Sequence, residues 1–165
     1  YKNQIQVIEA YAMLDHKEIK VPKLLLLGSK NEPYASEVEK LIKNKNLKNK
    51  IILTGAVDFE YMPQIYNYAK FIIFASRSEN CPNILMEAMM AGKAILCSKK
   101  YPMPEFGKKG VLYIDANNPK DIYEKINYLI KDETKIKDLE KAAISYSTTY
   151  TSKICSEKTW KFLIN

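Results

Sequence analysis

Arginine and histidine are almost absent from this chain of 165 residues. Arg77 is the single arginine and His16 the single histidine, so the net charge of +7 comes from lysine. Proteins that read nucleic acids favour arginine forks and clustered basic patches, whereas these lysines are spread along the chain. We therefore expect no nucleic-acid partner, and an anionic small ligand or an acidic membrane surface fits the charge as well.

Cysteine is scarce and widely spaced. Cys81, Cys97 and Cys155 form no Cys-x-x-Cys pair, and one histidine accompanies them, so we expect no metal site. Three reduced thiols are typical of a cytoplasmic protein, and a peripheral position on the inner face of the cell membrane stays open. His16 follows a helical stretch, and we expect it at the surface, not as a base.

Long apolar runs are missing as well. No run reaches the length of about 18 residues that a membrane-spanning helix needs, so we expect none. The chain starts at Tyr1 with helical spacing and without an initiator Met, so we expect it to be a piece of a longer protein. Its length and its apolar fraction of 47% fit one globular domain.

The sequence does contain an alternation of short apolar runs and amphipathic stretches. Short apolar runs predict strands at residues 21–29, 50–55, 70–75, 93–98 and 110–115, and the runs at 21–29 and 70–75 indicate buried strands. Helical spacing predicts helices at residues 3–14, 34–45, 61–69, 83–92, 119–132, 134–147 and 152–163. This order predicts an α/β fold with a Rossmann-like, doubly wound parallel sheet in three α/β/α layers, whose ligand lies beyond the carboxyl ends of the strands. We expect the aromatic residues of the last stretch, Trp160 and Phe162, to pack in the core.

The segment FASRSENCPNILMEAMMAG joins one of these strands to the next helix. Pro82 suits the first turn of that helix, and Cys81 is a poor capping residue. The backbone N–H groups of Asn83, Ile84 and Leu85 would then lack partners in the helix. An anion such as a diphosphate could accept hydrogen bonds from them.

Two acids flank this helix start. Glu87, one turn into the helix, could accept hydrogen bonds from paired hydroxyls such as those of a ribose, and Glu79 could do so for another polyol. Together with the helix end they suit a nucleotide sugar. The residues alone leave a plainer interpretation open, in which Glu87 favours the helix dipole and Glu79 is a solvated loop acid.

The longer segment FIIFASRSENCPNILMEAMMAGKAILCS resembles the donor-binding signature of retaining GT-B glycosyltransferases of group 1 (family 4). The shared features are a strand ending in Ser76, a Glu79-x7-Glu87 motif, Glu-Ala-Met at residues 87–89 and a small-residue-Gly turn at residues 91–92. The segments KNQIQVIEAYAML, LLLLGS, IILTGAV and PMPEFGKKGVLYIDANNPKDIYEKI resemble other parts of the same C-terminal domain. The resemblance extends over essentially the whole chain.

This resemblance implies roles for individual residues. Glu79 would contact donor-sugar hydroxyls near the reacting carbon, Glu87 would bind the ribose hydroxyls, and Lys2 would neutralise the diphosphate as it leaves. The backbone of residues 55–57 would meet the base, and Glu105 would touch the ligand or only hold its loop. The donor-binding residues implied besides Glu87 are Ser76, Asn80, Cys81, Asn83, Ile84, Leu85, Gly28, Gly55, Ala56, Val57 and Glu105.

The resemblance also implies what the whole protein does. Residues 1–165 would be the donor-binding domain, inactive alone, with the acceptor domain and the family's first strand outside this chain. The enzyme would need no metal or cofactor and would transfer a sugar to a saccharide or lipid-linked acceptor, as in cell-surface polysaccharide or glycolipid synthesis. A GT-B-like epimerase or phosphorylase, or a non-catalytic sugar-nucleotide-binding domain, remain alternatives. Asn80-Cys81-Pro82 departs from the family's Gly-Phe-Gly, and Pro82 costs the helix start one N–H group.

Overall fold

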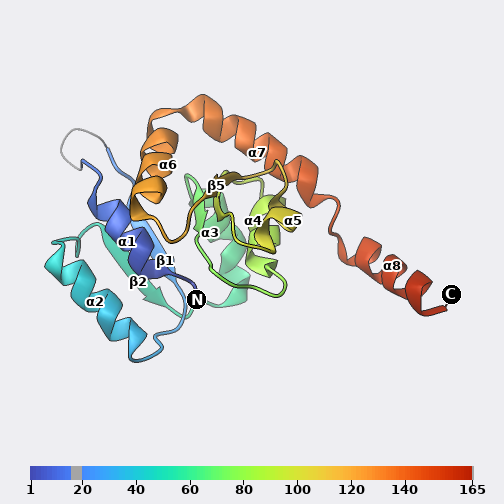
Figure 1. Ribbon diagram of the computed structural model, residues 1–165, viewed down its shortest axis with the longest axis horizontal. Coiled ribbons are helices and arrows are strands. Elements are labelled where there is room, and N and C mark those ends of the chain that lie inside the picture. Colours follow the sequence, from blue (N-terminus) through green and yellow to red (C-terminus); the bar gives the residue numbers. More distant parts are fainter. Residues whose placement is uncertain (16–19, 165) are drawn as a thin grey trace.

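The computed structural model describes residues 1–15 and 20–164, so His16 lies outside the described residues. Strands and helices alternate along the chain, which confirms the α/β class (Figure 1). The strands are β1 (Leu24–Leu27), β2 (Ile51–Gly55), β3 (Ile72–Phe74), β4 (Ile95–Ser98) and β5 (Leu112–Ile114). The helices are α1 (Gln4–Ala12), α2 (Tyr34–Asn44), the 3-10 turn η1 (Phe59–Tyr61), α3 (Met62–Tyr68), α4 (Asn83–Met90), α5 (Met103–Gly107), α6 (Pro119–Lys131), α7 (Glu133–Ser147) and α8 (Ser152–Ile164). Of these, η1 and the five-residue helix α5 were not predicted.

All of the strand pairs are parallel, as the helical crossovers require. Strands β1 and β2 form one hydrogen-bonded pair, and β3, β4 and β5 form a second group in that order. In the second group Leu96 of β4 pairs with Ile73 on one side and with Leu112 on the other. Within each group the carboxyl ends therefore meet at one edge, where the sequence predicts a ligand.

The three-layer arrangement is complete around β4. Its side chains are buried without alternation, and they divide between two cores. Leu96 belongs to a core with residues of α1, α2 and α6, whereas Ile95 and Cys97 belong to a core with residues of α3, α4 and α5. Successive residues of a strand point to opposite faces, so helices cover both faces of this strand.

Strand β1 departs from the prediction of a buried strand. Leu24 and Leu26 pack against the core that includes α1 and α2, but Leu25 and Leu27 are 38% and 36% exposed. Ile52 on the neighbouring strand is exposed as well. The prediction is wrong for β1 because the described helices cover one face of the β1–β2 pair and leave the other face open.

Helix ends follow the local signals of the sequence. Gly92 adopts a φ of 66° just after α4, and its N–H donates to the Met89 carbonyl at 3.0 Å, which ends the helix as predicted. Helix α6 begins at Pro119, and the Asn118 side chain accepts hydrogen bonds from the next free N–H groups.

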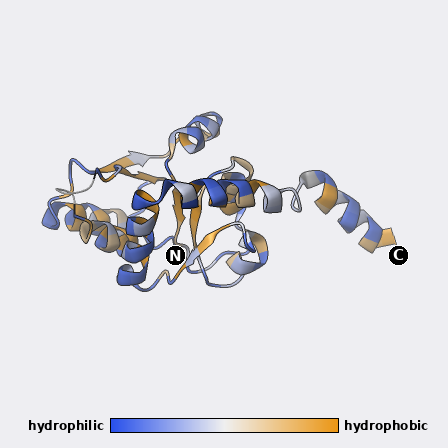
Figure 2. Ribbon diagram, turned by 90° about the horizontal axis from the view of Figure 1, so that it is seen from above, coloured by the Kyte–Doolittle hydropathy of each residue, from blue (hydrophilic) through white to orange (hydrophobic). Residues whose placement is uncertain are grey.

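Helix α8 runs away from the body of the molecule (Figures 1 and 2). Trp160 and Phe162 are 64% and 84% exposed, so the prediction that they pack in the core is wrong. The apolar residues of α8 lie on more than one side of the helix, so their pattern does not indicate one face that would pack against the rest of the protein. No helix within the described residues combines the length and the apolarity needed to cross a membrane.

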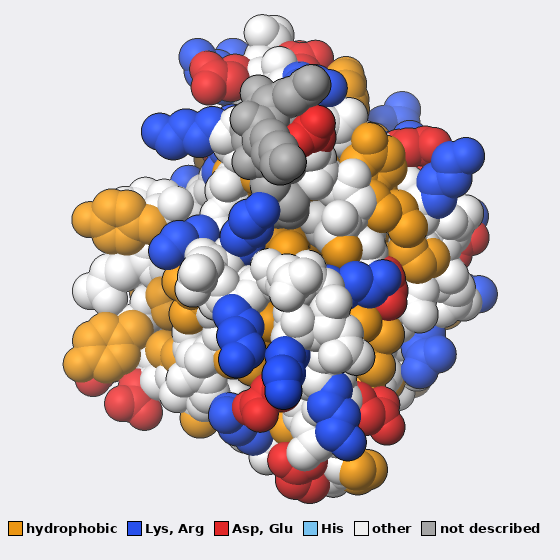
Figure 3. Space-filling model, turned by 90° about the vertical axis from the view of Figure 1, so that its left-hand side faces the viewer, with side chains coloured by type: hydrophobic (Ala, Val, Ile, Leu, Met, Phe, Trp, Pro, Cys, Tyr) orange, Lys and Arg blue, Asp and Glu red, His pale blue; other side chains and the backbone are white. Residues whose placement is uncertain are grey.

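Charged side chains are mixed on the face seen in Figure 3. Lysines there are interspersed with acidic, apolar and neutral side chains and do not form a continuous basic surface. Individual lysines also pair with acids, as Lys45 does with Glu9 at 2.7 Å. This distribution agrees with the scattered lysines of the sequence.

Candidate functional site

Lys2 is held in place by its two neighbours. The carbonyl oxygen of Tyr1 accepts a hydrogen bond from the Arg77 N–H at 3.0 Å, which ties the start of the chain to the loop after β3. On the other side, Asn3 sits at the N-cap of α1 with a φ of 65°, and its side-chain amide donates to the Ala116 carbonyl. Asparagine tolerates this left-handed conformation better than most residues do. Lys2 is thereby carried to the carboxyl edge of β3.

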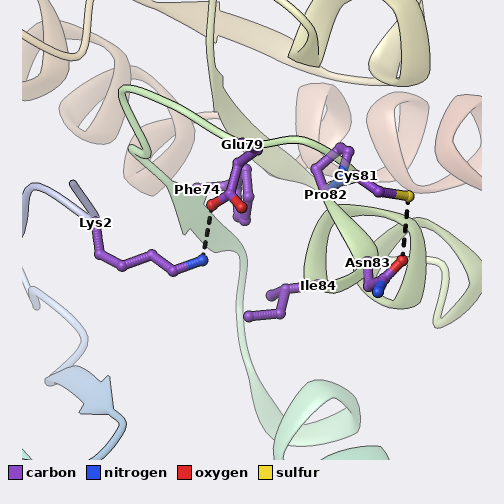
Figure 4. A pocket seen from close by; sticks show the side chains of 7 residues that line it. All are labelled: Lys2, Phe74, Glu79, Cys81, Pro82, Asn83 and Ile84. Carbon is purple, nitrogen blue, oxygen red and sulfur yellow. Dashed lines mark hydrogen bonds and ion pairs between the residues drawn. The ribbon is translucent and has the colours of Figure 1, made fainter.

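Glu79 comes to the same place from the loop after β3. Ser76 is buried at the start of this loop, and its hydroxyl donates to the Ser78 carbonyl at 3.1 Å. The Glu79 carboxylate then lies 2.7 Å from the Lys2 ammonium, with the two side chains 12% and 35% exposed (Figure 4). The Lys2 Nζ also lies 5.6 Å from the centre of the Phe74 ring, within the range of a cation–π contact.

A pocket of about 220 Å³ adjoins this ion pair. The N-terminal end of α4 contributes to its wall, and Figure 4 shows Ile84 beside the opening opposite Lys2. The Cys81 thiol donates to the Asn83 side-chain oxygen at 3.4 Å on the same wall. The residues that line the pocket are Lys2, Phe74, Glu79, Cys81, Pro82, Asn83 and Ile84.

The start of α4 offers fewer free donors than the sequence predicts. Pro82 occupies the N-cap position, one residue before the first helical residue, and supplies no N–H. The Asn83 N–H has no partner within α4, but it donates to the Cys81 carbonyl of the preceding loop at 2.9 Å and is not free for a ligand. Within the described part of the chain no backbone carbonyl accepts from Ile84 or Leu85. Leu85 is 0% exposed, so the helix end presents the N–H group of Ile84 to an anion, supported by the helix dipole.

Glu87 lies further along α4 and lines neither of the two pockets described here. Its Oε2 accepts a hydrogen bond from the Tyr66 hydroxyl at 3.0 Å. Tyr66 comes from α3 and is 7% exposed. Burial, and in second place the Glu87 carboxylate, raise the pKa of the Tyr66 hydroxyl far above its usual value. Tyr66 therefore stays a hydrogen-bond donor at every physiological pH.

A second pocket, of about 270 Å³, lies at the carboxyl ends of β1 and β2. The Gly28 N–H donates to the Gly55 carbonyl at 3.0 Å and closes the strand pair. Gly28 has a φ of 133°, which a residue with a Cβ rarely adopts. Leu26 and Tyr34 line the pocket with these glycines, and Lys2 lines both pockets. A ligand with an anionic centre beside Lys2 could therefore extend into either one.

The structure brings five of the predicted site residues to the first pocket and three to the second, with Lys2 shared. The remaining ones line neither pocket: they are Ser76, Asn80, Leu85, Glu87, Ala56, Val57 and Glu105. Glu105 lies on α5 and not on a loop as predicted; its carboxylate accepts from the Tyr101 hydroxyl at 2.6 Å and its carbonyl accepts from the Tyr150 hydroxyl at 2.9 Å. Leu85 is 0% exposed, so neither its side chain nor its backbone is accessible to a ligand in this structure.

Sequence reasoning missed three residues that shape the site. Phe74 lines the first pocket, and its place as the last residue of an apolar strand at the ligand edge was a usable signal. Asn3 stands next to Lys2, and its side chain hydrogen-bonds to Ala116, 113 residues away in the sequence. Tyr66 hydrogen-bonds to Glu87, 21 residues away. No local pattern points to such pairs.

The sequence model of the family "Glycosyl transferases group 1" matches residues 1–146, and the chain belongs to this family. A curated relative in Campylobacter jejuni is 27% identical over 141 residues, which cover 80% of this chain and 35% of the relative. It is named N-acetylgalactosamine-N,N'-diacetylbacillosaminyl-diphospho-undecaprenol 4-alpha-N-acetylgalactosaminyltransferase. The "uncharacterized glycosyltransferase MJ1178" of Methanocaldococcus jannaschii is 27% identical over 122 residues, 72% of this chain and 34% of that protein.

Solved structures share the fold. The crystal structure of Anabaena Alr3699/HepE in complex with UDP and glucose superposes with a TM-score of 0.85 at 19% identity. The match covers 100% of this chain and 46% of that one. The fold is thus that of the C-terminal, Rossmann-like domains of GT-B glycosyltransferases.

The chain spans about a third of the length of the curated relatives it matches.

Proposed function

We propose that this chain is the nucleotide-sugar-binding part of a retaining, metal-independent glycosyltransferase of the family 4 type. The observation that carries the proposal is the Lys2–Glu79 ion pair of 2.7 Å, set against the N-terminal end of α4 at the edge of the sheet where ligands bind. A cation, a carboxylate and Ile84, whose N–H has no backbone partner among the described residues, line one pocket. These groups suit a ligand that carries both a diphosphate and sugar hydroxyls.

In the proposed reaction the bond between the donor sugar and the diphosphate breaks, a new bond to the acceptor oxygen forms on the same face of the sugar, and the proton of the acceptor hydroxyl passes to the departing diphosphate. Negative charge then develops on the diphosphate. The Lys2 ammonium and the N–H group of Ile84 would stabilise that charge electrostatically, without a metal or cofactor. Glu79 would accept hydrogen bonds from hydroxyls of the donor sugar, and Glu87 from those of the ribose.

The acceptor side of the proposal comes from the relatives. The Campylobacter jejuni relative acts on a sugar linked to diphospho-undecaprenol, so we propose a saccharide or lipid-linked acceptor and a role in cell-surface glycan synthesis. The acceptor would be held by another part of the full protein. We place the enzyme in the cytoplasm, where nucleotide sugars are made, with a position at the inner face of the membrane for lipid-linked acceptors.

Calorimetric titration of the chain with UDP, GDP and ADP tests the donor site and identifies the base. We expect one of the three to bind, and Glu87→Ala to weaken that binding. Glu79→Ala should instead weaken the additional affinity that the sugar of the nucleotide sugar provides. A matched control is Glu9→Ala, which removes a carboxylate of α1 that pairs with Lys45 and lines neither pocket. No binding of any of the three at millimolar concentration refutes the donor site.

The alternatives predict different outcomes in the full-length protein. A glycosyltransferase consumes the nucleotide sugar only when an acceptor is present, whereas an epimerase converts it without one. A phosphorylase needs inorganic phosphate. Binding without turnover under all three conditions would indicate a non-catalytic domain. We favour the transferase because the chain belongs to the group 1 family.

A further inference from the structure

The packing of the core requires only the ring of Tyr66, and a phenylalanine would fill the same space without the hydroxyl group. The ring packs in the core that includes Phe74, Leu85 and Ala88, and the residue is 7% exposed. Burying a phenol hydroxyl costs free energy unless a partner accepts its hydrogen bond. The partner here is one carboxylate oxygen of Glu87, at 3.0 Å. The buried ring thus fixes a donor that points at a proposed ligand-binding acid.

Glu87 needs such a partner if it is to bind a ligand well. A glutamate side chain has three rotatable bonds, and holding it in one conformation costs rotamer entropy at the moment of binding. The hydrogen bond from Tyr66 engages Oε2, while Oε1 makes no hydrogen bond with any described residue. A carboxylate held in this way keeps one oxygen available for an incoming donor group.

We propose that Tyr66 is a positioning residue, which orients the Glu87 carboxylate in advance for the paired hydroxyls of the ligand's ribose. The inference rests on the proposed function, since it requires a nucleotide in this site. It adds α3 to the site: a helix that lines neither pocket would set the affinity for the ribose diol. The role of Tyr66 is exerted through Glu87, and the two residues should act as a unit.

A second contact holds α3 to the segment that follows α4, independently of this pair. The Lys93 ammonium donates to the Asn67 carbonyl at 2.8 Å, next to Tyr66 in the sequence. The Tyr66 ring itself also stays in the core when only its hydroxyl is removed. Tyr66→Phe should therefore preserve the fold and remove the orientation of Glu87 alone.

The experiment compares two ligands in calorimetric titrations: the nucleoside diphosphate that the wild-type chain binds, and its 2′,3′-dideoxy analogue. We expect Tyr66→Phe to lower the affinity for the ribose form about five- to tenfold, the effect of losing a hydrogen bond to a charged group that positions a binding residue. Its affinity for the dideoxy analogue should equal that of the wild type. Tyr113→Phe is the matched control, because Tyr113 packs against the same core and donates to the Lys108 carbonyl at 2.8 Å, away from Glu87.

Several results would overturn the role of Tyr66. They are equal losses for both ligands, unchanged binding of the ribose form, or full additivity of Tyr66→Phe with Glu87→Ala. If Tyr66→Phe does not fold, Glu87→Asp provides the second test, because its carboxylate is one methylene too short to meet Tyr66 and the ligand together. Undiminished ribose discrimination in that variant overturns the role as well. Failure of the wild type to bind UDP, GDP or ADP overturns the proposed function itself, so the two failures are distinguishable.

Discussion

Neutralising Glu79 should strengthen the binding of a free nucleoside diphosphate. In the structure the Lys2 ammonium is already paired, 2.7 Å from the Glu79 carboxylate. A diphosphate that recruits Lys2 must compete with this carboxylate, and it also meets the negative charge of Glu79 close by. Glu79→Gln removes both effects and keeps the size of the side chain.

The expected gain in affinity for the free diphosphate depends on how exposed Lys2 and Glu79 are. Lys2 is 35% exposed, so solvent screens the interaction, and the pair contributes about 1 kcal/mol, near the upper end of the range for exposed ion pairs. Releasing Lys2 should therefore raise the affinity for the free diphosphate about fivefold. The affinity that the sugar of the intact donor adds should fall in the same variant, because an amide is a weaker acceptor for sugar hydroxyls than a carboxylate is.

Calorimetric titration at low ionic strength measures both effects. Glu9→Gln is the control for net charge, because it breaks the Lys45–Glu9 pair, which also measures 2.7 Å, and changes the charge of the chain by the same amount. A gain with Glu79→Gln but none with Glu9→Gln supports the competition for Lys2. Weaker or unchanged binding by Glu79→Gln would refute it, as would an equal gain in both variants.

Two further predictions concern the scaffold. Gly92→Ala should lower the free energy of unfolding by about 1–2 kcal/mol in urea titrations, because the residue has a φ of 66° and a Cβ there would lie 2.8 Å from Ile144 Cδ1; unchanged stability would contradict the need for glycine at this helix end. Burial raises the pKa of the Cys97 thiol to about 12, so an alkylating reagent at pH 8 should modify Cys81 and Cys155, which are exposed, and reach Cys97 only after unfolding. Three modified thiols in the native chain, counted by mass spectrometry, would show that the core around β4 opens.

The parts of the fold that the sequence predicts well are those fixed by local chemistry. Gly92 ends α4 and Pro119 begins α6 because their backbone preferences act on one or two residues. Strand β4 was predicted as part of a parallel sheet between helices, and both of its faces are covered. The same reasoning failed for Leu25 and Leu27, because a run of four leucines carries no alternation that would mark an uncovered face.

The site was predictable as far as one continuous segment contains it. Glu79, Pro82 and Glu87 lie within nine residues, and their spacing placed an acid on each side of a helix start. The Lys2–Glu79 pair spans 77 residues, and it was suggested by the resemblance to a family and by no pattern in the residues. The partner of the Asn83 N–H was not predictable either, since it depends on the turn that the backbone makes at Pro82.

The ion pair also bears on which ligand the pocket should prefer under the proposed roles. A free diphosphate that draws Lys2 away leaves the Glu79 carboxylate, 12% exposed, without its cation. A nucleotide sugar supplies hydroxyl donors to that carboxylate at the same time as it supplies phosphate to Lys2. The phosphate of the donor would thus take the place of Glu79 beside Lys2, and the sugar hydroxyls would take the place of Lys2 beside Glu79. The spent nucleotide, which lacks the sugar, would supply a new partner to Lys2 only. Under the proposed roles, the pairing of Lys2 with Glu79 would therefore favour the intact donor over the spent nucleotide and would promote release of the product after transfer.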